Sequence, residues 1–125
     1  MRHAKSDWSD SSLADFDRPL NNRGRKAAPF MGNELLKRNK LPDLIISSPA
    51  NRAKTTAEKV AEAAGYSKEI QLEKDFYFGY IDEIIEIIRQ ADLQNNKILI
   101  LGHNPTWESM VSVLTENNLH ARMPT

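Results

Sequence analysis

Cysteine is absent from the 125-residue sequence, and histidine is rare. Without cysteine, disulfide scaffolds, thiolate zinc ribbons and thiol catalysis are excluded. The three histidines, His3, His103 and His120, do not stand in a short ligand spacing such as HExxH, so we expect no metal site. His120 has no partner pattern and is expected at the surface. No run approaches the ~20 apolar residues that a membrane span requires.

Neither sign of charge is in excess, because 17 Lys and Arg residues balance 17 Asp and Glu residues. A net charge of zero argues against bulk binding to nucleic acid or to an anionic membrane surface. Apolar residues make up 40% of the chain and charged residues 27%, which is typical of a folded, soluble domain. The length suits one domain over 1–125, and without a signal-peptide pattern we expect a cytoplasmic protein.

Strand and helix patterns alternate along the chain. Two short apolar runs predict strands buried on both faces, DLIISS at 43–48 and KILILG at 97–102, and EIQLE at 69–73 predicts a shorter strand. Apolar residues at helical spacing predict helices over 21–39, 51–65, 81–88 and from 105 onward. This alternation is typical of an α/β domain with a mainly parallel sheet covered on both faces.

The first and last helices carry predictions about their buried faces. Pro29 is expected to delay the start of the first helix or to bend it. The residues expected on the buried face of that helix are Ala27, Met31 and Leu35, with Ala28 and Leu36 beside them. The residues expected to be buried in the last helix are Met110, Val111 and Leu114.

Polar side chains follow both apolar strands where each strand hands over to a helix. Arg52 comes shortly after the strand at 43–48, and His103 follows the strand at 97–102. Ligands of parallel sheets bind outside the carboxyl ends of the strands, so these two side chains are expected to meet. Arg2 and His3 would join them if a strand lay ahead of them. Two histidines and two arginines suit phosphoryl transfer, with arginine forks on the oxygens and a histidine attacking phosphorus.

Four segments in sequence carry a family resemblance: MRHAKS, DFDRPLNNRGRKAA, DLIISSPANRAKTTAE and LILGHNPTWE. Together they resemble the histidine phosphatase superfamily, and most of all its SixA-like phosphohistidine phosphatases, over nearly the whole chain. Ala4 stands where glycine is commonest in the family. The resemblance implies a phosphoglycerate mutase-like, three-layer α/β/α fold and no cofactor.

The resemblance also implies a role for individual residues. His3 would be the nucleophile that becomes transiently phosphorylated, and Arg2 and Arg52 would hold the phosphoryl oxygens. His103 would be the second histidine of the pocket, and Arg18 a further phosphate contact. The implied substrate is phosphohistidine on a protein or a small phosphorylated molecule.

The sequence departs from the family at the expected acid. Many members supply a carboxylic acid to the leaving group, often a glutamate after the third strand, where this chain has Phe78. Asp75, Asp82 and Glu83 lie nearby in sequence, but nothing places them in the pocket. Phosphohistidine leaves as neutral imidazole when its distal nitrogen is protonated, and imidazole ionises near pH ~6.5. The missing acid therefore favours a phosphoramidate substrate over a phosphomonoester.

Two other functions stay open at this stage. One is a general phosphomonoesterase acting on small phosphate esters, which would need an acid. The other is a non-catalytic module that binds phosphate or a protein. Arg52 could instead be an exposed helix residue and His103 a structural histidine at a strand end. Trp8 could pack in the interior or line the mouth of the pocket.

The ends of the chain differ from the family pattern as well. The resemblance implies a buried strand ahead of Arg2 and one or two further strands beyond LHARMPT. We therefore expect the terminal strands to be truncated. An exposed sheet edge invites pairing with another chain, so weak stability or pairing between chains would follow if the 125 residues were the whole product. The oligomeric state is left open.

Overall fold

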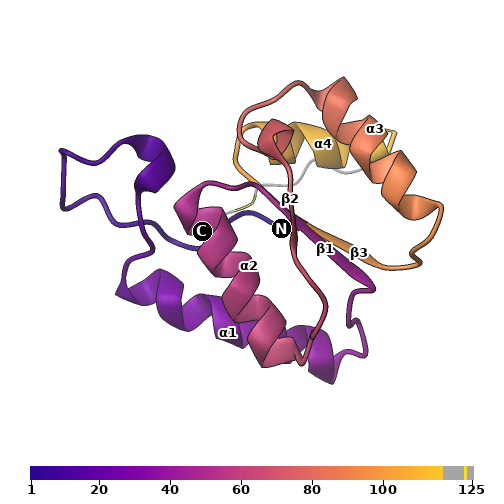
Figure 1. The fold of residues 1–125 in the computed structure, drawn as a ribbon, viewed down its shortest axis with the longest axis horizontal. Coiled ribbons are helices and arrows are strands. Elements are labelled where there is room, and N and C mark those ends of the chain that lie inside the picture. Colours follow the sequence, from indigo (N-terminus) through magenta and orange to yellow (C-terminus); the bar gives the residue numbers. More distant parts are fainter. Residues whose placement is uncertain (117–122, 124–125) are drawn as a thin grey trace.

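A parallel sheet forms the centre of the computed structural model, which describes residues 1–116 and 123 (Figure 1). Its strands are β1 (Leu44–Ser47), β2 (Gln71–Leu72) and β3 (Ile98–Leu101), in the order β2-β1-β3. β1 pairs along its whole length with β3, so that Ser47 stands opposite Leu101. The three predicted strands and their parallel arrangement are confirmed.

Helices cover both faces of this sheet. They are α1 (Asn22–Lys37), α2 (Asn51–Ala64), α3 (Ile81–Asp92) and α4 (Thr106–Leu114). Figure 1 shows α1 and α2 on one side of the sheet and α3 and α4 on the other. Alternate residues of β1 point to the two sides, because Ile45 packs against Ala57 of α2 whereas Ile46 packs against Ile84 and Met110. The three-layer α/β/α architecture is therefore as predicted.

The buried face of α1 differs from the predicted one. Gly24, Ala28 and Gly32 are the buried residues of this helix. Of the residues expected on this face or beside it, Ala28 is buried, whereas Ala27, Met31 and Leu36 are exposed and Leu35 is half-buried. A Cβ at Gly32 would lie 2.8 Å from Cβ of Ala63 and still closer to the carbonyl of Val60. α1 therefore approaches α2 so closely that only the smallest residues fit between them.

The start of α1 is also earlier than Pro29 suggested. Asn21 caps the helix, and its side-chain oxygen accepts a 2.9 Å hydrogen bond from the Gly24 N–H. This bond fixes the helix start ahead of Pro29, which lies inside the helix. At the other end of the pair, Gly65 closes α2 with φ of 74°, in the left-handed region that favours glycine, as predicted.

α4 buries fewer residues than predicted. Trp107 and Met110 are buried, whereas Val111 is half-buried and Leu114 is exposed. The prediction for Leu114 was wrong: it shares the helix face of Trp107 and Met110 but is the last residue of α4, beyond the apolar cluster to which those two residues belong. Within the described residues, none of the helices combines the length and apolar character that crossing a bilayer requires.

A short pairing with β3 positions the first residues of the chain. Arg2 and Gly102 form an isolated parallel bridge. The His3 N–H donates to the Gly102 carbonyl at 3.1 Å, and the Gly102 N–H donates to the Met1 carbonyl at 3.2 Å. This pairing holds Arg2 and His3 at the carboxyl end of β3, next to His103. Apart from Met123, the segment beyond 116 lies outside the described residues, and so does His120.

Candidate active site

One ring nitrogen of His3 carries the proton, which fixes the tautomer, and the other holds a lone pair. Nδ1 lies 2.7 Å from the Ala4 carbonyl oxygen, which only accepts, so Nδ1 carries the proton. Nε2 therefore holds the lone pair, and it accepts a 3.2 Å hydrogen bond from Nε of Arg52. Burial, with the positive charges of Arg52 and Arg2, lowers the pKa of His3 to about 4. The ring is neutral at physiological pH, as an attacking histidine must be.

Arg52 joins His3 to a carboxylate. It stands in the first turn of α2, and its side chain is buried. Nη1 donates to the backbone oxygen of Asp15 at 2.6 Å, and Nη2 lies 2.9 Å from Asp15 Oδ2. The guanidinium therefore bridges His3 and Asp15. The alternative interpretation of Arg52 as an exposed helix residue is therefore wrong.

Asp15 is a residue of this site that the sequence analysis missed. It begins the 3-10 helix η1 (Asp15–Asp17), on the loop that follows His3. Its Oδ2 also accepts a 2.8 Å hydrogen bond from the Tyr77 hydroxyl. Burial raises the pKa of Asp15, but the hydrogen bonds from Tyr77 and Arg52 outweigh it and hold the pKa below its usual value. The available signal was an acidic residue within the family segment DFDRPLN.

His103 lies against His3 inside a ring of aromatic side chains. Its ring centroid is 5.0 Å from that of His3, 5.3 Å from that of Tyr77 and 5.1 Å from that of Phe78. Its Nε2 lies 2.8 Å from the Ser48 hydroxyl. Burial, with the nearby positive charge of Arg52, lowers its pKa to about 3. His103 is therefore a buried, neutral partner of His3.

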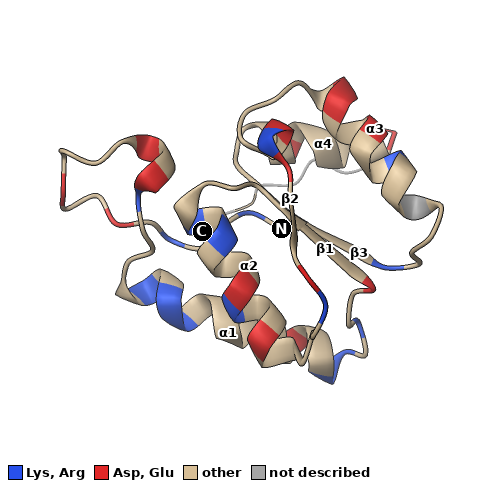
Figure 2. Ribbon diagram, viewed as in Figure 1, with Lys and Arg blue, Asp and Glu red and all other residues tan. Residues whose placement is uncertain are grey.

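These side chains line a cavity of about 310 Å³. Its lining residues are Arg2, His3, Lys5, Ser6, Trp8, Asp15, Arg52, Phe78, His103 and Asn104. Lys and Arg gather here, at the start of α2 and among the first residues of the chain (Figure 2). Three cationic side chains face one carboxylate in the lining, which makes the cavity suitable for a phosphoryl group. Four of the predicted site residues, Arg2, His3, Arg52 and His103, thus come together.

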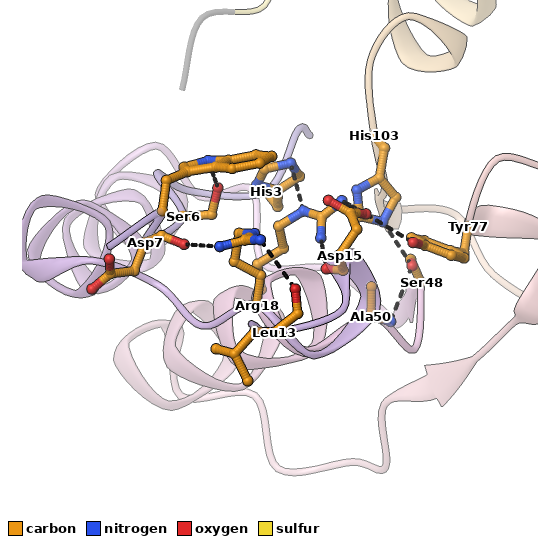
Figure 3. A network of polar contacts seen from close by, with 12 residues as sticks. His3, Ser6, Asp7, Leu13, Asp15, Arg18, Ser48, Ala50, Tyr77 and His103 are labelled. Atoms are coloured by element: carbon orange, nitrogen blue, oxygen red, sulfur yellow. Dashed lines mark hydrogen bonds and ion pairs between the residues drawn. The ribbon is translucent and has the colours of Figure 1, made fainter. Parts of the chain in front are cut away.

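Arg18 lies apart from this cavity. Its guanidinium donates to the backbone oxygens of Asp7, Asp10 and Leu13 at 3.1–3.2 Å and lies 4.1 Å from the centre of the Trp8 ring. These contacts tie together the loop that carries Asp15, as Figure 3 shows. The structure does not bring Arg18 into the lining, and its contact with phosphate stays a prediction.

The position expected for a family acid is indeed occupied by an aromatic residue in the lining. Phe78, with φ of 58°, faces His103. The three carboxylates considered from the sequence, Asp75, Asp82 and Glu83, are exposed and do not line the cavity. Trp8 lines the cavity while staying 67% exposed, so it stands at the mouth. Across residues 1–116 and 123, no three histidine or carboxylate side chains cluster as a metal site requires.

Comparison with known proteins places the chain in a family. Residues 1–77 match the model of the histidine phosphatase superfamily, branch 1. An uncharacterised chloroplast protein of Arabidopsis thaliana is 32% identical over 92% of this chain, which spans 57% of that protein. An uncharacterised protein of Mycobacterium tuberculosis is 32% identical over 91% of this chain and 69% of its own length. The chain belongs to the histidine phosphatase superfamily.

Solved structures define the type of fold within that family. A protein of Agrobacterium tumefaciens assigned as the phosphohistidine phosphatase SixA matches with a TM-score of 0.84 and 29% identity, over 94% of this chain and 75% of that one. A protein histidine phosphatase SixA complexed with tungstate matches with a TM-score of 0.91 over all of this chain and 80% of its own, at 20% identity. The fold is phosphoglycerate mutase-like and SixA-like.

Proposed function

We propose that this chain is a phosphatase that removes the phosphoryl group from phosphohistidine on a protein, through a covalent phosphohistidine intermediate on His3. The observation that carries the proposal is the state of the His3 ring. Its Nδ1–H is committed to the Ala4 carbonyl, and its Nε2 lone pair faces a cavity lined by Arg2 and Arg52. A neutral nucleophile beside two guanidinium groups suits attack on a phosphoryl group.

The first chemical step needs no external proton. His3 Nε2 forms a bond to phosphorus as the bond from phosphorus to the substrate imidazole breaks, and the electron pair of that bond goes to the leaving ring. The leaving imidazole is neutral because its distal nitrogen already carries a proton. Arg52 exchanges its Nε hydrogen bond to His3 for one to a phosphoryl oxygen, and Arg2 contributes a second fork. His103, neutral and in contact with the His3 ring, lines the same cavity.

The charge state of Asp15 supports a phosphoramidate substrate. An alkoxide leaving group requires a protonated acid, and Asp15 is the carboxyl group in the cavity lining. Its lowered pKa keeps it ionised at neutral pH, so it has no proton to give. A leaving imidazole requires none. The site as built therefore suits a P–N bond better than a phosphate ester.

The nucleophile is tested by substitution. His3→Ala is expected to lose about 1000-fold or more of the turnover of a phosphohistidine peptide, because the covalent route is removed. Brief incubation with radiolabelled phosphoramidate should place acid-labile label on the wild-type chain and none on the variant. Circular dichroism verifies that the variant is folded. Equal turnover by His3→Ala and wild type would sink the proposal.

The same assay separates the other two functions. High turnover of a panel of small phosphate esters, with slow turnover of the phosphohistidine peptide, would indicate a general phosphomonoesterase. Binding of orthovanadate without turnover of any substrate would indicate a phosphate-binding module.

A further inference from the structure

We infer that the carboxylate of Asp15 is the general base that activates the water hydrolysing the phosphorylated His3. The inference rests on the proposed function and adds a catalytic residue to it, at a position the family pattern did not supply. Its grounds are the place of Asp15 in the cavity, the sharing of Arg52 between Asp15 and the nucleophile, and the chemistry of the residues around it.

The position of Asp15 is set by the same guanidinium that contacts the nucleophile. Arg52 donates from Nε to His3 Nε2 and from Nη2 to Asp15 Oδ2. A phosphoryl group on Nε2 that is held by Arg52 therefore lies beside this carboxylate. Oδ2 is engaged by Arg52 and by the Tyr77 hydroxyl. Oδ1 accepts no hydrogen bond from the described residues, so it is available to a water molecule.

The other groups of the lining suit this task less well. Arg2, Lys5 and Arg52 are cations, and the ring of His3 is itself phosphorylated at this stage. His103 has its Nε2 engaged with the Ser48 hydroxyl, and its ring is packed among the rings of His3, Tyr77 and Phe78. Asp15 is 44% exposed at its side chain, so it can pass a proton on to solvent. Its lowered pKa keeps it in the basic form at neutral pH.

The step balances in atoms and charge. The water oxygen forms a bond to phosphorus, the bond from phosphorus to His3 Nε2 breaks, and its electron pair returns to Nε2. The ring leaves neutral because Nδ1 keeps the proton that it donates to the Ala4 carbonyl. The proton of the water goes to the Asp15 carboxylate and then to solvent, and hydrogen phosphate departs.

The test follows the lifetime of the phosphorylated enzyme. Asp15→Asn keeps an oxygen that can accept from Arg52 and Tyr77, but it removes the base. Mixed with radiolabelled phosphoramidate, this variant should form the phosphorylated chain within a few-fold of the wild-type rate. After a chase with unlabelled donor, its label should decay about 100-fold more slowly or worse, because general bases contribute roughly that factor. Asp17→Asn, an exposed change in the same 3-10 helix, should decay like wild type.

A second variant separates a base from a residue that only positions Arg52. Tyr77→Phe removes a hydrogen bond that lowers the pKa of Asp15. The decay of the label slows at low pH, where Asp15 becomes protonated, and in this variant that slowing should begin at a higher pH. The decay rate on the plateau at higher pH should be kept. The inference is overturned if Asp15→Asn decays at the wild-type rate. It is also overturned if Asp15→Asn slows the formation and the decay of the phosphorylated chain equally and weakens orthovanadate binding. Asp15 would then only position Arg52. If the wild-type chain takes no label on His3, the proposed function fails first, and this inference falls with it.

Discussion

At the scale of the residue, the guanidinium group of Arg52 connects the side chains of the candidate site. Nε of Arg52 donates a hydrogen bond to Nε2 of His3. Its two terminal nitrogens donate to the backbone oxygen and to the carboxylate of Asp15. The side chain is buried, so these contacts are made away from bulk water, where charged hydrogen bonds are strong and unpaired groups are costly. Among the described residues, Arg52 is the one that forms hydrogen bonds with both His3 and Asp15.

Arg52→Lys is expected to lower kcat/KM by about 100-fold, because lysine keeps the charge but cannot donate in three directions from a planar fork. The measurement is the steady-state rate on a phosphohistidine peptide. Arg89→Lys, the same change at an exposed position of α3, should leave the rate unchanged. A kcat/KM for Arg52→Lys within about twofold of wild type would show that charge alone matters here.

The sequence was sufficient to predict that the residues following β1 and β3 come together at one edge of the sheet. Arg52 and His103 follow β1 and β3, and parallel pairing brings the carboxyl ends of those strands to one edge. Asp15 and Arg18 belong to a loop, where the path of the backbone is set by contacts rather than by periodicity. The carbonyls of that loop and the Trp8 ring hold Arg18 outside the cavity, and the turn of η1 brings Asp15 into it. No spacing rule predicts either outcome.

At the scale of the element, the two helices on one face of the sheet are joined by a seam of small residues. Gly24, Ala28 and Gly32 repeat every four residues along α1, which places them on one side of the helix. A Cβ at Gly24 would collide with the backbone of Lys5, just beyond the nucleophile. The seam therefore sets how closely α1 approaches both α2 and the segment that carries His3.

Gly32→Ala is expected to destabilise the fold by about 1–3 kcal/mol, although alanine is the better helix former. The added methyl would meet the Val60 carbonyl and the Ala63 methyl, and the backbone of α2 would have to shift. Urea denaturation measures the change. Asn33→Ala, at the exposed neighbouring position, gains helix propensity without a clash and should raise the free energy of unfolding by a few tenths of a kcal/mol. A stabilised Gly32→Ala variant would contradict the close approach.

The strands and the helix α2 were predictable because their apolar residues are large or strictly periodic. α1 was misread because glycine and alanine contribute little to hydrophobic periodicity, while larger residues such as Met31 stand on its exposed side. The close contact that selects glycine involves α2, which lies elsewhere in the sequence. A tertiary contact thus overrode the local pattern.

At the scale of the whole molecule, the fold buries several ionisable side chains. His3, Arg18, Arg52 and His103 are among its buried residues. Burying an ionisable ring opposes its charged form, so the two histidines are held neutral by the fold itself. The burial that holds the His3 ring neutral therefore makes the stability of the molecule depend on pH.

This coupling gives a prediction with a definite sign. The pKa of His3 is about 4 in the folded chain, against 6.5 for an unperturbed histidine. Above pH 6.5 neither state binds the proton, and the full stability is present. Between pH 6.5 and pH 4 the unfolded chain binds a proton that the folded chain does not, so the free energy of unfolding falls as the pH falls. His103, with its pKa lowered to about 3, acts in the same direction.

Replacing one of these rings should make stability less sensitive to acid. Between pH 6 and pH 5, His3→Asn is expected to reduce the slope of unfolding free energy against pH by about 1 kcal/mol per pH unit, because one fewer proton is taken up on unfolding. Urea denaturation at closely spaced pH values measures both slopes, and the difference between them cancels groups that titrate in both proteins. NMR titration of the wild-type ring gives an independent pKa for His3. Equal slopes, together with a His3 pKa near 6.5, would mean that the folded site accommodates an imidazolium and that the fold does not itself hold the His3 ring neutral.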